Sequence, residues 1–143
     1  MTIAKYPPVI KHEVVTDRWT EPFWANAREG RLVIAACGAC GTMRMPPGPY
    51  CPVCLSQEIE WKTLSGRGTI YSYTVVRRSI ISGMEDSIPY VPAVVTLDGA
   101  DGNRLVSAMV ESAIEDIRID APVEIVWSTG AGKQPVPYFR LAT

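Results

Sequence analysis

Apolar and polar residues alternate along most of the C-terminal two thirds of the chain, and this alternation predicts β-strands with one buried face. The pattern recurs in five segments: GTIYSYTVVRRS (68–79), VPAVVTL (91–97), NRLVSAMVE (103–111), PVEIVW (122–127) and VPYFRLA (136–142). Turn-forming residues separate the first three, with SGMEDSIP (82–89) and DGADGN (98–103) between them. We therefore predict five strands in succession.

One segment among these strands has a different pattern. SAIEDIRIDA (112–121), between the third and fourth strands, is the only stretch there that favours a helical turn. Five strands with a short helical insertion at this point follow the order of an OB-type Greek-key barrel. The pattern thus predicts a mainly β protein whose residues 65–143 form a five-stranded OB-fold barrel.

Residues 1–30 are predicted to form an extended arm followed by a short helix. Pro7 and Pro8 exclude a helix from the arm. In TEPFWANAREG (20–30), Thr20 is a candidate helix cap and Gly30 a candidate stop. A helix of about two turns is too short to be stable alone, so it must dock. Its docking face would be Phe23, Trp24 and Ala27, which either cover the core or form a ligand or partner surface.

Residues 31–64 contain all four cysteines of the chain, in the stretch CGACGTMRMPPGPYCPVC (37–54). RLVIAA (31–36) is predicted to be a strand leading into this stretch, and EIEWKTL (58–64) a strand leading out of it. The Pro-Pro-Gly-Pro bend favours a hairpin that brings the two Cys-x-x-Cys pairs together. Two such pairs supply the tetrahedral four-cysteine site that structural zinc prefers. We predict a rubredoxin-like zinc ribbon with Cys37, Cys40, Cys51 and Cys54 as ligands.

Other uses of four cysteines fit this pattern less well. Disulfides conflict with a reducing compartment, and a thioredoxin-like dithiol needs a single pair at a helix start. A catalytic zinc site keeps one position open for water, whereas four thiolates close the shell. Rubredoxin-type iron uses the same spacing, so iron remains an alternative to zinc on spacing alone.

Charge and hydropathy limit the classes of partner that the chain is expected to bind. The formal net charge is −1, and no segment is basic, since residues 66–143 carry seven basic and nine acidic groups. Proteins that bind phosphate backbones need a basic surface, so nucleic acid is an unfavoured partner. The longest apolar run, LVIAAC (32–37), is too short to span a bilayer, and the N-terminal residues lack the apolar region of a signal peptide. We expect a cytoplasmic protein without a membrane segment.

No catalytic set is evident in the sequence. The only histidine, His12, lies in the predicted arm, which leaves no Ser-His-Asp or Cys-His arrangement for the folded body. TGAGKQP (129–135) departs from a phosphate-binding loop, because Gln134 stands where Ser or Thr would bind magnesium. Contact of Lys133 with a phosphate remains a weaker alternative. We therefore predict no catalytic residue in this chain.

The order of these motifs resembles one known family over nearly the whole chain. The matching segments are PFW (22–24), EGRL (29–32), the two Cys-x-x-Cys pairs, EIEW (58–61), SGRGTIYSYTVV (65–76), PYVPAVVTL (89–97), NRLVSAMVE (103–111) and VEIVW (123–127). Together they are similar to the zinc-ribbon and OB-fold proteins associated with acyl-CoA metabolism, long described as a domain of unknown function. One departure lies in RIDAPVEIV (118–126), where the family pattern has a glycine near Asp120.

The resemblance implies a protein partner. Members of the family accompany thiolase-superfamily enzymes, including aldolases that shorten steroid side chains, or hot-dog-fold enoyl-CoA hydratases. They help bind the CoA part of the substrate and hold the assembly together, while the partner carries the carbon–carbon chemistry. On this basis we expect a non-catalytic acyl-CoA-associated subunit. Its candidate ligand or partner residues are Trp19, Phe23, Trp24, Arg77, Arg78 and Lys133.

Two other functions compete with this expectation. OB barrels bind single-stranded nucleic acid by stacking bases on strand aromatics, and Tyr71 and Tyr73 are predicted to share one face of the first barrel strand with Arg77. Barrel packing is an alternative role for these tyrosines, and the charge balance opposes nucleic acid. Electron transfer would require iron in the four-cysteine site, which a red colour would reveal.

Overall fold

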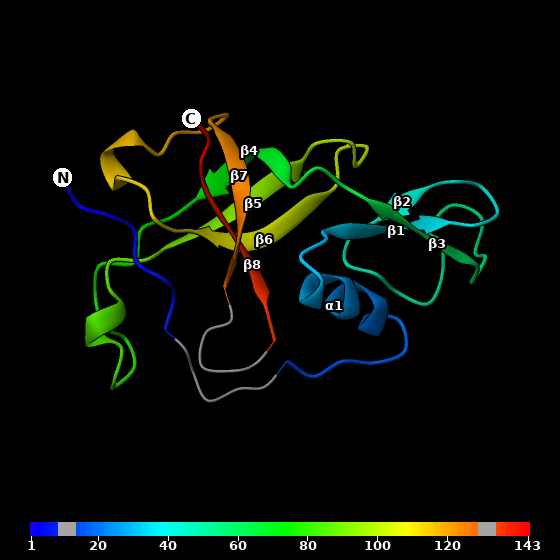
Figure 1. Cartoon of the computed structure of the whole chain (residues 1–143), viewed down its shortest axis with the longest axis horizontal. Helices are drawn as coiled ribbons and strands as arrows, with labels where there is room; N and C mark the ends of the chain where they lie inside the picture. Colours follow the sequence, from blue (N-terminus) through cyan, green and yellow to red (C-terminus); the bar gives the residue numbers. More distant parts are fainter. Residues whose placement is uncertain (9–13, 129–133) are drawn as a thin grey trace.

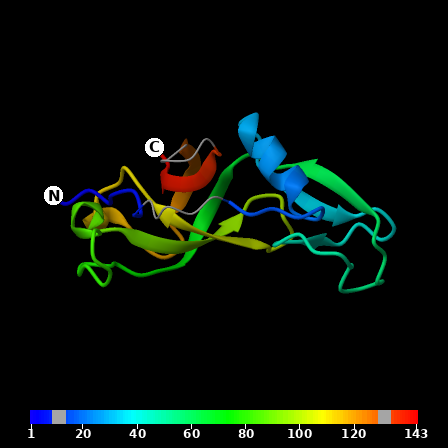
Figure 2. The same cartoon turned by 90° about the horizontal axis from the view of Figure 1, so that it is seen from below.

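The computed structural model describes residues 1–8, 14–128 and 134–143. In these residues a short helix and a three-stranded sheet are followed by a closed barrel (Figure 1). The sheet and the barrel lie side by side along the long axis of the molecule, as the two perpendicular views agree (Figures 1 and 2). The predicted mainly β fold with an N-terminal helix, a ribbon and an OB-type barrel is confirmed.

The three-stranded sheet is the ribbon, in which β1 (Val33–Cys37) lies between β2 (Met43–Arg44) and β3 (Ile59–Thr63). Every residue of β1 is buried, which explains why its sequence is continuously apolar instead of alternating. Strands β1 and β3 are those predicted from RLVIAA and EIEWKTL. Strand β2 was not predicted, because two residues are too few to show a period and their pairing with β1 defines the strand.

Helix α1 (Glu21–Arg28) packs its buried Phe23 and Ala27 toward β1, and the chain turns away after it at Gly30, whose φ of +74° suits glycine. The predicted cap is wrong in detail, since the side chain of Thr20 does not cap the helix. Instead, Asp17 Oδ1 accepts hydrogen bonds from the N–H groups of Trp19 and Thr20, at 2.8 and 2.9 Å. Asp17 thus closes the turn that leads into the helix.

The barrel consists of β4 (Arg67–Tyr73), β5 (Val91–Leu97), β6 (Arg104–Met109), β7 (Pro122–Ser128) and β8 (Val136–Leu141). They close in the order β4-β5-β6-β8-β7, which is the OB-type topology that the sequence predicts. Short 3-10 turns occupy Glu85–Ser87, in the predicted β4–β5 turn, and Ile114–Asp116, in the predicted helical insertion.

The first barrel strand differs from its prediction because it ends at Tyr73 and contains a bulge between Ile70 and Ser72. A bulge adds one residue to a strand and turns the following side chains over. Tyr71 is therefore 53% exposed beneath the Arg104 guanidinium, 3.7 Å from the ring centroid. Tyr73 points inward, and its hydroxyl donates to the Ile117 carbonyl at 3.1 Å. The prediction of a shared face is wrong, and barrel packing holds for Tyr73 alone.

The turn before β7 keeps the backbone shape that a glycine would favour. Asp120 has a φ of +66°, in the left-handed region, and its N–H donates to the Ile70 carbonyl at 2.8 Å. Aspartate tolerates this conformation better than most side chains, although less well than glycine. The departure from the family pattern at this position thus changes a residue and leaves the turn in place.

The N-terminal arm adds an extended segment to one end of the barrel. Ala4 donates to the Ser112 carbonyl at 2.8 Å and accepts from the Glu111 N–H at 3.2 Å, and Lys5 donates to the Pro89 carbonyl at 3.0 Å. Ala4 is 2% exposed and belongs to the core cluster. That cluster runs from the barrel through Leu32, Val33 and Ile34 into the base of the ribbon. Ribbon and barrel therefore share one core.

Candidate metal centre and apolar groove

Two turns at the tip of the ribbon bring the four cysteines together. Cys37 ends β1, and Cys40 follows in a turn in which the N–H groups of Ala39 and Cys40 point at the Cys37 sulfur, each at 3.4 Å. The second pair repeats this arrangement, with the Val53 N–H 3.4 Å from the Cys51 sulfur. Such N–H donors stabilise thiolates, as expected around metal-bound cysteine.

The sulfur positions fit one tetrahedral ion. The Cys37 and Cys54 sulfurs lie 3.5 Å apart, those of Cys40 and Cys51 lie 3.6 Å apart, and all four fall within 4.8 Å of one another. Zinc–sulfur bonds of about 2.3 Å in a tetrahedron place sulfurs roughly 3.8 Å apart. The N–H groups of Cys54 and Val53, with thiol hydrogen bonds, lower the pKa of Cys51 to about 6, which favours the thiolate that zinc needs.

The shell is closed, and this defines its role. Cys37 and Cys51 are buried, whereas Cys40 and Cys54 are exposed at the surface of the tip. With four thiolate ligands no position remains for water, so the site suits structural zinc. Arg44, which is buried, braces the loop between the pairs by donating from Nη2 and Nε to the Gly48 carbonyl, at 2.8 and 3.2 Å. Fold and metal are thus coupled at the tip.

The two Cys-x-x-Cys turns, or knuckles, have different residues at one equivalent position. The residue after each second cysteine closes the turn by donating its N–H to the carbonyl of the first cysteine, at 2.9 Å for Gly41 and 3.0 Å for Leu55. Both have a left-handed backbone, with φ of +81° and +65°. Glycine adopts this conformation without cost, but leucine does not. Leu55, 72% exposed, therefore carries local strain.

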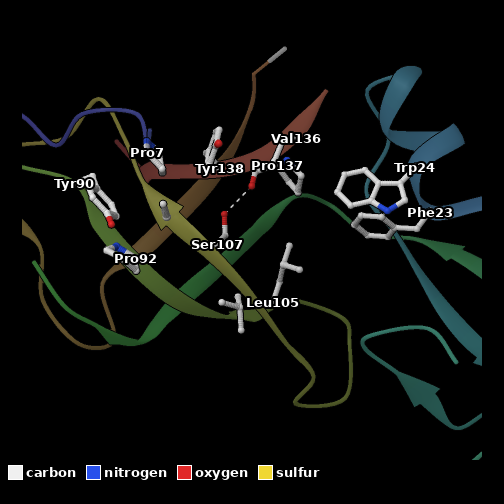
Figure 3. Close-up of a pocket in the computed structure, with 12 residues that line it drawn as sticks. Pro7, Phe23, Trp24, Tyr90, Pro92, Leu105, Ser107, Val136, Pro137 and Tyr138 are labelled. Atoms are coloured by element: carbon white, nitrogen blue, oxygen red, sulfur yellow. Dashed lines mark hydrogen bonds between the residues drawn. The ribbon is translucent and has the colours of Figure 1, made fainter. Parts of the chain in front are cut away.

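A second feature is an apolar groove of about 380 Å³ between α1 and the barrel (Figure 3). Its walls come from the arm, α1, β5, β6 and β8, and are formed by Pro7, Phe23, Trp24, Tyr90, Pro92, Leu105, Val106, Ser107, Ala108, Val136, Pro137 and Tyr138. The rings of Phe23 and Trp24 meet edge to face, with centroids 5.1 Å apart. Aromatic and proline side chains in a concave site suit an apolar ligand or an extended chain.

Gln134 fixes α1 against the barrel at this groove. Its Nε2 donates to the Trp24 carbonyl at 3.2 Å, and its Oε1 accepts from Arg28 Nη1 at 2.7 Å. In the sequence this residue counted only against a phosphate-binding loop, and no local pattern indicates its contact with a helix 110 positions away. Pro137 has a local signal in the sequence, because a proline within a strand indicates that its backbone is unpaired on one side.

The structure separates the residues predicted to bind ligand or partner. Phe23 and Trp24 line the groove, and Trp19 is half-buried with the Arg18 guanidinium 4.8 Å from its ring centroid. Arg77 and Arg78 are exposed in the β4–β5 connection, a segment that lies at the end of the barrel away from α1 (Figure 1).

Arg77 lies near the second 3-10 turn. Backbone N–H groups at Glu115 and Thr2, helped by the charge of Arg77, lower the pKa of Glu115. Lys133 and His12 lie outside the described residues. Arg77 follows Val76, whose backbone pairs with Tyr90 of the groove wall, so the arginines lie toward the end of the groove opposite Phe23 and Trp24 (Figure 3).

Within the described ranges, the four cysteines are the only group of three or more His, Cys, Asp or Glu side chains arranged to hold a metal ion. No helix among these residues has the length and apolar character needed to cross a membrane. Two acidic pairs lie in the 3-10 turns. Glu85–Asp86 is in the turn before β5, and Glu115–Asp116 is in the turn after β6.

Two family models match the chain in succession. The first, described as the rubredoxin-like zinc ribbon domain of ChsH2, matches residues 24–60, and the second, described as the ChsH2 C-terminal OB-fold domain, matches residues 61–128. The predicted boundary between residues 64 and 65 stays a prediction. The family match and the sulfur geometry agree on a structural zinc site.

Curated relatives extend the similarity. A DUF35 domain-containing scaffold protein of Methanocaldococcus jannaschii is 32% identical over 80% of this chain and 80% of its own length. A protein of the same description from Pyrococcus furiosus is 32% identical over 73% and 74%. A probable enoyl-CoA hydratase alpha subunit of Thermomonospora curvata is 41% identical over 84% of this chain, which spans only 37% of that relative.

Solved structures have the same fold. A chain of the Ltp2–ChsH2(DUF35) aldolase matches with a TM-score of 0.82 and 36% identity, over 92% of this chain and 100% of that one. A DUF35 family protein of unknown function from Sulfolobus solfataricus matches with a TM-score of 0.62 and 16% identity, over 89% and 87%, and supports the fold alone.

Proposed function

This chain belongs to the ChsH2 family of DUF35 zinc-ribbon and OB-fold proteins, and we propose that it is a non-catalytic subunit of a thiolase-superfamily enzyme complex. In this role it helps to bind an acyl-CoA substrate and stabilises the assembly, while the partner performs carbon–carbon bond formation or cleavage. The zinc ribbon holds α1 and the barrel in a fixed relation and so keeps the groove between them in shape.

One observation carries this proposal. The chain matches a whole chain of an aldolase complex, at 36% identity over 92% of its own length. The site chemistry supports the same role, because the metal shell is closed to substrate and the groove walls are apolar. The surfaces are therefore suited to contact, and bond cleavage is left to the partner.

Contact with CoA is the finer part of the proposal. The phosphates of CoA need cations, which the exposed Arg77 and Arg78 supply, with Lys133 as a further candidate. Trp19 and Trp24 are aromatic candidates near α1. Because the arginines lie away from α1, we propose that CoA is held between this chain and the partner, with only one of these groups in contact.

A second candidate partner is an enoyl-CoA hydratase. The Thermomonospora curvata relative, 41% identical to this chain, is described as a probable hydratase alpha subunit, and it is much longer than this chain. Its additional length leaves room for a separate catalytic domain. A hydratase partner would use the same scaffold and change only the reaction.

Co-expression tests the proposal and separates the two partners. The tagged chain is expressed with the thiolase-like protein of its source genome, and in parallel with the hot-dog-fold hydratase, and each eluate is analysed by light scattering. We expect a stoichiometric complex with the thiolase-like protein. A complex with the hydratase alone would replace the first partner with the second, and a free chain in both experiments would contradict the proposal.

A further inference from the structure

We propose that the free edge of β6, along the apolar groove, binds an extended segment of the catalytic partner as an added β-strand. The inference rests on the proposed function only in taking the partner to be a protein subunit. It names a position on this chain, the peptide groups of Val106 and its neighbours, and a mode of recognition that uses main-chain hydrogen bonds.

The alternation of hydrogen bonds along β6 shows which of its peptide groups face the groove. Leu97 donates to the Asn103 carbonyl at 3.1 Å, so alternate residues from Asn103 onward pair with β5. Val110 donates to the Phe139 carbonyl of β8 at 2.8 Å, which shows that the other set points away from β5. Val106 belongs to this second set and therefore directs its N–H and C=O toward β8.

Strand β8 does not take up these groups. The two strands form a parallel ladder only at Met109 and Phe139. Further along the groove, Pro137 has no N–H, and its carbonyl already accepts from the Ser107 hydroxyl at 2.6 Å (Figure 3). Among the described residues, the β6–β8 ladder does not reach Val106, and no hydrogen bond outside the strand ladders pairs its N–H or C=O. The peptide groups of Val106 are thus left free on β6, and Pro137 of β8 cannot pair with them.

The chain already pairs an extended segment with the continuation of β6, although on the side that faces β5. Beyond β6 the backbone reaches Glu111 and Ser112, and the arm pairs with it there through Ala4. The arm then reaches the groove at Pro7. An extended segment of the partner along Val106 would pair in the same manner on the opposite side of β6, which faces β8.

The walls of the groove favour a polypeptide over other occupants. Side chains at alternate positions of an added strand would meet Trp24, Leu105 and Tyr138, and Val106, 78% exposed, would pack against those on the outer face. An acyl chain would contact the same walls but leave the Val106 peptide groups unpaired. Unpaired strand edges bind extended chains because these supply both donors and acceptors.

Amide exchange in the complex tests the inference directly. The chain is mixed with the thiolase-like partner, and exchange of the amides of Val106 and Arg104 is measured by NMR or mass spectrometry. We expect their exchange to slow at least about tenfold, as expected for newly formed hydrogen bonds. Exposed amides at the tip of the ribbon, around Gln57, serve as the control and should keep their rates.

Two variants at one position separate main chain from side chain. Val106→Pro removes the N–H and leaves the β5 ladder, so affinity for the partner should fall about tenfold or more. Val106→Ala keeps the N–H and should stay within about threefold. Thermal unfolding of both free variants checks that the barrel is intact.

The outcomes distinguish this inference from the proposed function. A complex that forms with unchanged exchange at Val106 contradicts strand addition and leaves the partnership standing. Slowed exchange on adding a pantetheine thioester alone would assign the edge to the substrate, and slowed exchange in a homodimer would assign it to a second copy; each overturns the inference. Failure of any complex to form overturns both proposals.

Discussion

The tip of the ribbon and the barrel are stabilised in different ways within one chain. Across residues 38–58 only Arg44 and Cys51 are buried, so the tip has almost no apolar core. The barrel strands, in contrast, supply fully buried side chains such as Ile70, Val95 and Phe139. The tip must therefore obtain its stability from the metal, whereas the barrel obtains it from burial of apolar surface.

This difference explains why the most conspicuous sequence motif is not part of the surface that we propose for binding. Four cysteines are conspicuous because metal ligands need fixed residue types at fixed spacing. The groove uses ordinary apolar residues from five segments, and its main-chain edge has no sequence requirement beyond the absence of proline. The motif thus locates the scaffold, and the proposed interaction surface lies beside it.

Loss of zinc should give the largest effect and should separate the two regions. Zinc binding at such sites contributes on the order of 10 kcal/mol, so Cys51→Ser should unfold residues 38–58 and leave the barrel folded. Amide spectra would show the tip signals collapse while those of β4–β8 remain, with Ser56→Ala as the control. The purified protein should be colourless and contain about one zinc per chain. A red iron chromophore, or an intact tip without metal, would contradict this.

A cavity in the barrel should give the opposite result. Phe139 is fully buried, and Phe139→Ala should lower the free energy of unfolding by about 3–5 kcal/mol. Because one core joins the barrel to the ribbon base, denaturant unfolding should shift for both regions together. Val106→Ala, at a 78% exposed position of the same barrel, is the matched control and should change little. Equal effects of the two substitutions would refute the assigned core.

The strained knuckle predicts a smaller gain within the tip. Leu55→Gly places glycine in a left-handed backbone and should stabilise the zinc-bound tip by about 1 kcal/mol. Ala39→Gly, in the first knuckle, releases no such strain and should be neutral or slightly destabilising. Zinc competition with a chelator measures both. Equal loss of zinc affinity in both variants would show that the strain at Leu55 is unimportant.

The smallest effect concerns the arm at the far end of the barrel. Partial burial and a hydrogen bond to the Glu111 carboxylate raise the pKa of Tyr6 to about 12 from 10.0. A raised folded pKa means that this contribution to stability is complete below pH 10 and is lost as the pH rises toward 12. The denaturation midpoint should fall more between pH 9.5 and about 11.5 in the wild type than in Tyr6→Phe. Identical pH profiles would contradict the assigned contact.

Much of the fold could be predicted because it follows from local pattern. The alternation in VPAVVTL gave the bounds of β5, and cysteine spacing gave the metal ligands. The bulge at Tyr71 could not be predicted, since it depends on how β4 pairs with β5. The missing glycine near Asp120 left the shape of that turn open, and the structure shows that aspartate holds a left-handed backbone there.

The groove lay beyond sequence analysis for a related reason. Trp24 was a candidate from its place on a short helix, but its neighbours Leu105 and Tyr138 are more than 80 positions away in the chain. Only the closed barrel brings these residues together. Only the alternation of hydrogen bonds along β6 shows that the peptide groups of Val106 face the groove. Long-range contacts of this kind leave no periodic signal.

Reconstituted turnover is the most direct test of the account, which holds that this chain supplies binding surfaces and its partner supplies the chemistry. Carbon–carbon bond cleavage or formation on an acyl-CoA is measured for the thiolase-like partner alone, for this chain alone, and for both together. We predict no turnover by the chain alone and a large gain when it is added to the partner. Turnover by this chain alone, or partner activity unchanged by its addition, would contradict the account.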